Sequence, residues 1–222
     1  MINETFYKFD KEGNVLPYYG NTIISFMNQK TNEIYQTAVK VQKQLMESGF
    51  KDCLSFLPPS SFHMTVLPLC RVIDKGTQEW PNFIPEIISF KQVDLILMEK
   101  VEKIKFPEGI VMILDSCDET KLVAKPFNEQ SEKLLKQYRD EISEITGIRH
   151  GEHGIYRFHI SYSYKIKPFN EQQQKEKDEL CAGITEELQR IAHPFPVSAA
   201  QFVIFNDMLS YYTDISQRGS LY

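Results

Sequence analysis

Two short segments of the chain share one pattern of residue types: an apolar residue, a histidine, a second apolar residue and then a hydroxyl residue. They are Phe62-His63-Met64-Thr65-Val66 and Phe158-His159-Ile160-Ser161-Tyr162. A given histidine meets this pattern by chance about once in a hundred times, so two cases among five histidines are a ~10⁻³ event. The repetition therefore points to a shared chemical role.

Both segments alternate as a β-strand does, with successive side chains on opposite faces. The histidine and the hydroxyl of each motif then share one face, and the apolar residues share the core face. On the second strand the same alternation places Arg157 and Ser163 on the face of His159, and it places Tyr162 and Tyr164 on the core face. We expect two imidazoles and two hydroxyls to meet across a groove, around a small anion.

This set of groups suits phosphoryl chemistry. Displacement at phosphorus needs a base on the attacking oxygen, an acid on the leaving oxygen and donors for the non-bridging oxygens. Histidine can take either proton role near neutral pH, and hydroxyls donate hydrogen bonds without adding full charge. We predict His63, His159, Thr65 and Ser161 as the catalytic residues, with Arg157 as the cation; the scheme requires no metal ion and no cofactor.

The elements that carry these motifs follow from hydrophobic periodicity and from glycine and proline positions. Apolar residues spaced three or four apart predict helices at 31–48, 128–146 and 171–191. Apolar, β-branched runs predict strands at 22–27, 62–67 and 157–166, and hairpins at 93–104 with 109–116 and at 201–205 with 209–215. Residues 71–90 read as irregular or as a short helix.

This order mixes strands and helices without strict alternation, which indicates an α+β fold with antiparallel sheets. No Ser/Gly linker or low-complexity stretch divides the chain. We expect residues 1–222 to form a single domain of two packed lobes, each supplying one His-x-Thr/Ser motif.

Composition narrows the function. A net charge of -5 argues against a protein that binds long nucleic acid, while a small charged substrate stays compatible with it. The four cysteines form no C-x-x-C pair, which fits reduced thiols, and no apolar run approaches the roughly 20 residues of a membrane span. Because the N-terminal residues also lack a secretory pattern, we expect a cytoplasmic protein with no membrane partner.

The paired motifs resemble those of the 2H phosphoesterase superfamily, which includes 2'-5' RNA ligase-like proteins and 2',3'-cyclic nucleotide phosphodiesterases. Three further segments are similar to an uncharacterised branch of that superfamily, the domain-of-unknown-function-1868-like group: Leu16-Pro17-Tyr18-Tyr19-Gly20-Asn21-Thr22, the turn Leu57-Pro58-Pro59-Ser60-Ser61 before the first motif, and Phe205-Asn206-Asp207-Met208. The resemblance covers nearly the whole chain. It implies a duplicated bilobal α+β fold, with two antiparallel sheets facing across a central groove and helices outside.

The resemblance also implies metal-independent cleavage of a phosphodiester, with one motif histidine as general base and the other as general acid. The substrate would be a 2',3'-cyclic nucleotide or a short 2'-5' or cyclic oligonucleotide. We add Arg157, Ser163, Asn21 and His150 as candidate substrate-binding residues. The sequence leaves open which histidine is the base, and it says nothing of oligomeric state.

Other interpretations remain beside this one. A nucleotide-binding or sequestering module could keep the same groove without turnover, and RNA ligation is less suited to so acidic a chain. A zinc site at His150, His153 and His159 with Glu152 is conceivable, but the spacing fits no common template. The glycines at 151 and 154 favour a loop over the groove instead.

Overall fold

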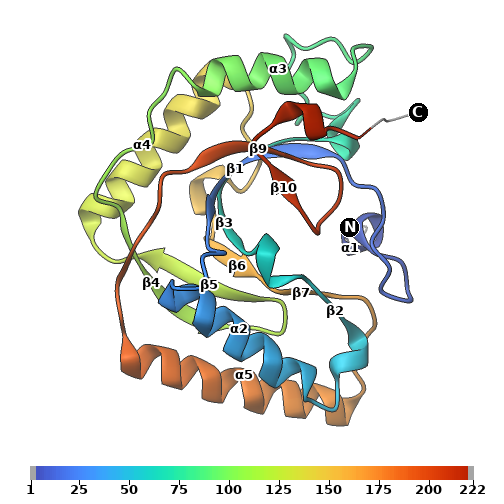
Figure 1. Ribbon diagram of the computed structural model, residues 1–222, viewed down its shortest axis with the longest axis vertical. Coiled ribbons are helices and arrows are strands. Elements are labelled where there is room, and N and C mark those ends of the chain that lie inside the picture. The colour runs from blue at the N-terminus through green and yellow to red at the C-terminus, as the bar shows by residue number, and fades with distance from the viewer. Residues whose placement is uncertain (1–3, 220–222) are drawn as a thin grey trace.

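The structure is a computed structural model that describes residues 4–219. Its centre is a curved antiparallel sheet with the strand order β10-β9-β1-β3-β6-β5-β4-β8 (Figure 1). The bounds are β1 Gly20–Phe26, β3 His63–Arg71, β4 Val111–Cys117, β5 Lys121–Pro126, β6 His159–Ser161, β8 Phe195–Pro196, β9 Gln201–Phe205 and β10 Tyr211–Tyr212. A second, two-stranded sheet pairs β2 (Leu54–Phe56) with β7 (Ser163–Lys165).

The α+β class is confirmed, and the two sheets expected from the sequence are the two halves of one curled sheet. One half contains β3 with the first motif, and the other contains β6 with the second. The halves are joined where β3 pairs with β6, at Met64 opposite Ile160. This junction brings two motifs 96 residues apart in the chain onto neighbouring strands.

Helices lie at both ends of the sheet in the view of Figure 1, with α3 and α4 at the top and α2 and α5 at the bottom. Their bounds are α1 Thr5–Lys8, α2 Glu33–Met46, α3 Phe90–Val101, α4 Glu129–Thr146 and α5 Glu171–Ile191. Helix α5 is fastened to β4 by the Thr185 hydroxyl, which accepts from the Cys117 amide at 3.0 Å. Helix α4 ends at Gly147, whose φ of 64° is the left-handed conformation that glycine adopts freely. The predicted helices at 31–48, 128–146 and 171–191 are thus confirmed.

The strand predicted at 93–104 is wrong, because residues 93–101 belong to α3 and residues 102–104 form the turn after it. Ser89 and Gln92 form a capping box that starts the helix, and its buried positions follow a helical spacing: Phe90, Val93, Asp94, Leu97 and Val101. The β-branched content of this stretch favoured a strand, but the cap and the spacing decide for a helix. The true partner of β4 is β5, a strand that the sequence reading left unassigned.

The strand predicted at 157–166 is split into β6 and β7. The first pairs with β3 and β5, and the second pairs with β2 in the small sheet. The break falls at Tyr162, and beyond it the side chains no longer keep the alternation of a single strand. This change of sheet alters which residues reach the functional site.

The remaining predictions were largely right. The strands at 22–27 and 62–67 correspond to β1 and β3, and residues 201–205 match β9. The closing hairpin is shorter than predicted, because only Tyr211 and Tyr212 pair with β9 and a 3₁₀ turn follows at Ile215–Gln217. Residues 72–89 are irregular apart from a short 3₁₀ turn at Val72–Asp74, as expected. No helix within residues 4–219 is long and apolar enough to cross a membrane.

Candidate active site

The two motifs meet in a cavity of about 590 Å³, which we call the central cavity. Its lining includes His63, Thr65, His159 and Ser161. Because Met64 is paired with Ile160 across β3 and β6, the antiparallel register places His63 next to Ser161 and Thr65 next to His159. Each imidazole therefore has the hydroxyl of the other motif as its cross-strand neighbour.

The two imidazoles are held in the same way. Nδ1 of His63 lies 2.7 Å from the carbonyl oxygen of Ser61, and Nδ1 of His159 lies 2.8 Å from that of Arg157. A carbonyl only accepts hydrogen bonds, so each Nδ1 carries a proton and donates it. In the neutral ring Nε2 is then the unprotonated nitrogen, and the tautomer is set identically in both motifs by the residue two positions earlier.

Burial separates the two histidines. His63 is only 8% exposed, and burial lowers its pKa from 6.5 to about 4. The hydrogen bond to the Ser61 carbonyl raises the pKa, and the neighbouring His159 lowers it, but burial has the largest effect. Burial also lowers the pKa of His159, but this side chain is half-buried. Both rings are therefore mainly neutral at pH 7 when no ligand is bound, and His63 resists protonation more strongly.

Phenols surround the imidazoles. The ring of Tyr211 lies 4.1 Å from the ring of His63, and the ring of Tyr156 lies 6.2 Å from that of His159. Burial raises the pKa of Tyr156 to about 12 and raises the pKa of Tyr211 well above its ordinary value. Both groups stay protonated at neutral pH and, with Thr65 and Ser161, supply uncharged hydroxyl groups to this cavity.

Two cations in the wall are already neutralised. Arg71 contacts Glu4 at 3.3 Å, Asp74 at 2.7 Å and Glu79 at 2.7 Å, and Lys8 contacts Glu4 at 3.0 Å. Burial opposes ionisation of Glu4, yet Lys8, a hydrogen bond from the Tyr18 hydroxyl and Arg71 together hold its pKa at about 2. Sequence reasoning missed this network, although Arg71 lies on the same strand as His63 and Thr65 and extending the count of two would have reached it.

The structure places two of the candidate substrate-binding residues outside the lining of the central cavity. Arg157 lines two neighbouring cavities, one of which His159 also lines, and the Arg157 carbonyl holds the His159 ring. Ser163 is buried and donates its hydroxyl proton to the Glu119 carbonyl at 2.6 Å. Tyr164, predicted to lie in the core, lines the central cavity instead, because the strand breaks at Tyr162.

Asn21 and His150 both line the central cavity, but their side chains are bonded to the protein. The Asn21 amide donates to Asp94 at 2.9 Å and accepts from the Cys70 amide at 2.9 Å. The ring nitrogens of His150 lie 3.0 Å from Glu79 and 2.9 Å from the Leu69 carbonyl. His150 thus ties the glycine-flanked loop to β3 at the edge of the cavity.

No group of three or more His, Cys, Asp or Glu side chains suited to a metal ion occurs within the described part of the chain. His153, part of the zinc alternative, instead lies 2.9 Å from Asp140 through Nε2. The polar side chains that line the central cavity include imidazoles, hydroxyls and phenols.

The curled sheet with its paired His-x-Thr/Ser motifs defines a 2H phosphoesterase-like protein. The chain belongs to the family 2H-phosphodiest, described as "Domain of unknown function (DUF1868)", whose model matches residues 8–123 and so includes the first motif. The resemblance drawn from the sequence is thereby confirmed at the level of the family.

Two further comparisons each cover most of the chain. The chain is 25% identical over 196 residues to "Uncharacterized protein 127L" of Invertebrate iridescent virus 6, a match that covers 78% of this chain and 79% of that protein. The crystal structure of the conserved protein of unknown function ATU0111 from Agrobacterium tumefaciens superposes with a TM-score of 0.86, at 22% identity, over 92% of this chain and 88% of that one. The likeness to ATU0111 shows the fold of this chain.

A second solved structure, TT0787 of Thermus thermophilus, has a TM-score of 0.42 at 15% identity over 83% of this chain and 87% of that one.

Proposed function

We propose that the protein hydrolyses a phosphodiester by general acid–base catalysis between His63 and His159, without a metal ion. The observation that carries this proposal is the pairing of the two motifs on adjacent strands, with both rings held through Nδ1 so that both Nε2 atoms are left for proton transfer. A phosphodiester between them would receive a base on one side and an acid on the other.

The difference in burial favours His63 as the base and His159 as the acid. His63 stays neutral down to about pH 4, so its Nε2 accepts a proton from the attacking water or hydroxyl. His159 is less buried and gains a proton more readily, especially once an anionic substrate is bound. Thr65, Ser161 and the nearby phenols donate hydrogen bonds to the non-bridging oxygens.

The proposed substrate is a 2',3'-cyclic nucleotide or a short 2'-5' or cyclic oligonucleotide. A cavity of about 590 Å³ lies in the usual range for small-molecule ligands, and a net charge of -5 disfavours a long polyanion. Tyr156, Tyr164 and Tyr211 line the cavity and offer apolar faces on which a base can stack.

The test is product release from a panel of 2',3'-cyclic nucleotides, 2'-5' and 3'-5' dinucleotides and cyclic oligonucleotides, with EDTA present. We expect turnover by the wild type, and a loss of at least 10²-fold in kcat in His63→Ala and in His159→Ala. His193→Ala is the matched control, because His193 is exposed and outside the cavity, and it should keep wild-type turnover. Equal activity in all three variants would reject the proposal.

A second candidate function rests on one specific observation. Burial lowers the pKa of both histidines, so in the free protein neither is a ready acid. A nucleotide-binding module without turnover would have the same properties. Tight binding by equilibrium dialysis with no product over long incubation, in the wild type, would favour this function over hydrolysis.

A further inference from the structure

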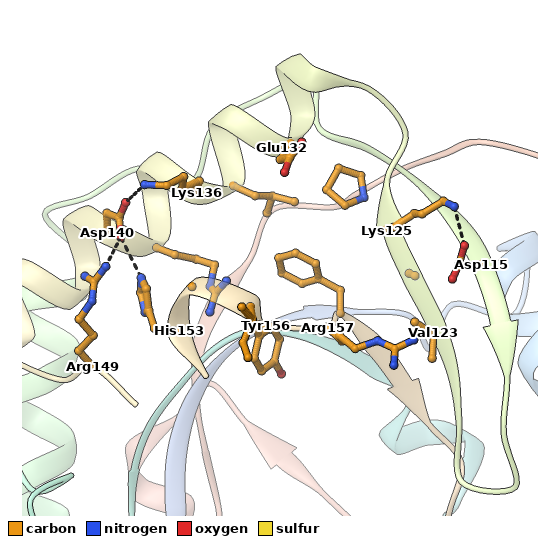
Figure 2. A pocket seen from close by; sticks show the side chains of 17 residues that line it. Asp115, Val123, Lys125, Glu132, Lys136, Asp140, Arg149, His153, Tyr156 and Arg157 are labelled. Carbon is orange, nitrogen blue, oxygen red and sulfur yellow. Dashed lines mark hydrogen bonds and ion pairs between the residues drawn. The ribbon is translucent and has the colours of Figure 1, made fainter. Parts of the chain in front are cut away.

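A second cavity, which we call the side cavity, lies next to the central cavity and has a volume of about 360 Å³ (Figure 2). Arg139 from α4, together with His153 and Tyr156, lines both cavities, so these residues form the wall between them. The Arg139 side chain is buried, with 6% of the residue exposed. A buried guanidinium must be paired or must be awaiting a partner, because its desolvation is costly.

Three other cations of the side cavity, Lys125, Lys136 and Arg149, have carboxylate partners. Among the described residues neither Arg157 nor Arg139 has one, but Arg157 is exposed to solvent whereas Arg139 is buried. Figure 2 shows Lys136 and Arg149 directed to Asp140, at 2.6 and 3.0 Å, and Lys125 directed to Asp115. By contrast, Nε and Nη2 of Arg139 are buried and make no hydrogen bond to any residue between 4 and 219. Arg139 therefore has no hydrogen-bonded counter-ion among the described residues, and Asp140 favours its charge only through space.

The same two atoms bind carboxylates elsewhere in this chain. Arg71 contacts Asp74 through Nε at 3.1 Å and Nη2 at 2.7 Å, and Arg218 contacts Asp94 through Nε at 2.6 Å and Nη2 at 2.7 Å. These two nitrogens form a parallel fork that matches two oxygens of one anion. In Arg139 this fork has no acceptor.

The guanidinium of Arg139 is fixed in orientation by two aromatic rings. Its Cζ lies 4.7 Å from the ring centroid of Tyr156 and 5.6 Å from that of Phe158. Burial lowers the pKa of Arg139, which reflects the cost of leaving it without an acceptor. Nδ1 of His153 is a third buried atom that has no partner within the described residues. Three unmet polar atoms on two residues of one wall indicate a missing ligand.

The remaining lining defines the class of ligand. Its charged members are Lys125, Lys136, Arg139, Arg149 and Arg157 against Asp115, Glu132 and Asp140, which is an excess of positive charge. Its apolar members include Val123, Ala124, Pro126, Leu135 and Phe158. We propose that the side cavity binds a small molecule with a two-oxygen anionic group, a carboxylate or a phosphate, on an apolar body, and that the Nε/Nη2 fork of Arg139 holds that group.

Entry requires a small movement, because Nε and Nη2 are covered in the free protein. The 3₁₀ turn His153–Ile155 lines the side cavity, and its last two residues are exposed. Ile155 is 79% exposed, and a Cβ added at Gly154 would meet no atom within 4 Å. We expect Gly154 and Ile155 to move on entry, whereas His153 is buried and bonded to Asp140 at 2.9 Å.

The test separates this site from the proposed reaction by using the His63→Ala, His159→Ala double variant, in which the motif imidazoles are absent. Benzoate and phenyl phosphate serve as probes, since each joins an apolar ring to a two-oxygen anion, and benzyl alcohol serves as the uncharged control. Binding is followed by the ¹⁵N–¹H signal of the Arg139 Nε–H group in an NMR titration. We expect a saturable shift with one or both anions and none with the alcohol.

Arg139→Lys is the decisive variant, because it keeps the positive charge but lacks the fork. We expect it to retain the wild-type melting temperature within a few degrees and to bind the anion at least tenfold more weakly, as followed by backbone amide shifts of the 153–158 segment. Arg190→Lys, at an exposed position of α5 outside both cavities, is the matched control and should bind within twofold of the parent. Wild-type affinity in Arg139→Lys, or no saturable shift in the parent, would overturn the proposal.

The variant Arg139→Met tests whether Arg139 has a purely structural role. If Arg139 awaits a ligand, removing its buried charge should leave the melting temperature in ligand-free buffer unchanged or raised, and should abolish the rise that the anion produces. A melting temperature that drops in ligand-free buffer, with anion binding retained, would mean that Arg139 serves only to pack against Tyr156 and Phe158.

Discussion

The two motif histidines share a backbone partner at the same spacing but differ in their surroundings. His63 begins β3 and is enclosed near the Tyr211 ring, whereas His159 begins β6 and remains half-buried. Because burial disfavours the charged imidazolium, one sequence pattern yields two bases of different strength. This asymmetry is what a pair of complementary proton-transfer groups requires.

The pH dependence of kcat/KM should report this asymmetry. The rate requires neutral His63 and protonated His159, so it should fall at low pH as His63 gains a proton near pH 4, and fall again as pH rises and His159 loses its proton below 6.5. We expect an optimum on the acidic side of neutrality for the free enzyme. The measurement is kcat/KM at constant ionic strength across this range; a rate that climbs steadily through neutral pH would contradict the assignment.

The buried His63 also predicts a pH dependence of stability. Its folded pKa of about 4 lies below the ordinary value of 6.5, so the unfolded chain binds the proton more tightly. The stabilisation is complete above pH 6.5 and is lost as pH falls towards 4, by an amount on the order of 3 kcal/mol. Urea unfolding of wild type and His63→Gln should show the free energy of wild type falling more steeply over this interval. Parallel curves would mean that His63 is protonated equally easily in both states.

At the scale of elements, the change of sheet between β6 and β7 decides which side chains face the substrate. The Ser163 hydroxyl makes a buried hydrogen bond to the Glu119 carbonyl, whereas the Tyr164 side chain lines the central cavity. Ser163→Ala should therefore lower the free energy of unfolding by about 1–3 kcal/mol and leave KM within twofold. Tyr164→Ala should raise KM, and because its ring also packs against Phe9 at 5.0 Å it should lower the free energy of unfolding as well. Steady-state kinetics and urea unfolding of the two variants check this; a KM effect confined to Ser163→Ala would contradict the structure.

Helix α3 is fastened to the C-terminal segment by a buried ion pair. Asp94 is fully buried and contacts Arg218, which is also buried and donates to the Gly20 carbonyl at 2.8 Å. Removing one partner leaves an uncompensated buried charge, so Arg218→Met should cost about 3–5 kcal/mol. The double variant Asp94→Leu, Arg218→Met should recover part of that loss in a thermal or urea unfolding experiment. If the double variant is less stable than the single one, the pair is not coupled in this way.

At the scale of the whole molecule, the net charge of -5 leads us to expect small anions as partners and not long nucleic acids. A ligand with one or two phosphates displaces few counterions, so its affinity should fall by about tenfold or less between 50 and 200 mM salt, whereas a contact with many phosphates would lose ~10³-fold or more. The measurement is the Kd of a substrate analogue as a function of salt concentration, with a long single-stranded RNA as competitor. Strong competition by the RNA would contradict this prediction.

Much of the architecture was accessible from the sequence because it depends on local rules. The helical stripes before Gly49 and Gly147 and the alternation around His63 are properties of neighbouring residues, and they were confirmed by α2, α4 and β3. The family resemblance was confirmed by a family model that covers the first motif. The exceptions arise where two local signals compete. In 93–104 the β-branched residues suggested a strand, while the Ser89 cap and the helical spacing of buried residues prevailed.

Tertiary structure alone decided the composition of the cavities, because the contacts join segments far apart in the chain. Lys8, Arg71 and Tyr211 meet the motif histidines only after the sheet has curled, and Arg139 is left without a carboxylate only because α4 packs it against Tyr156 and Phe158. Residue type and spacing determined that two imidazoles and two hydroxyls share strand faces. Burial, which depends on everything packed around a side chain, decided how basic each imidazole is and which cations remain available to a ligand.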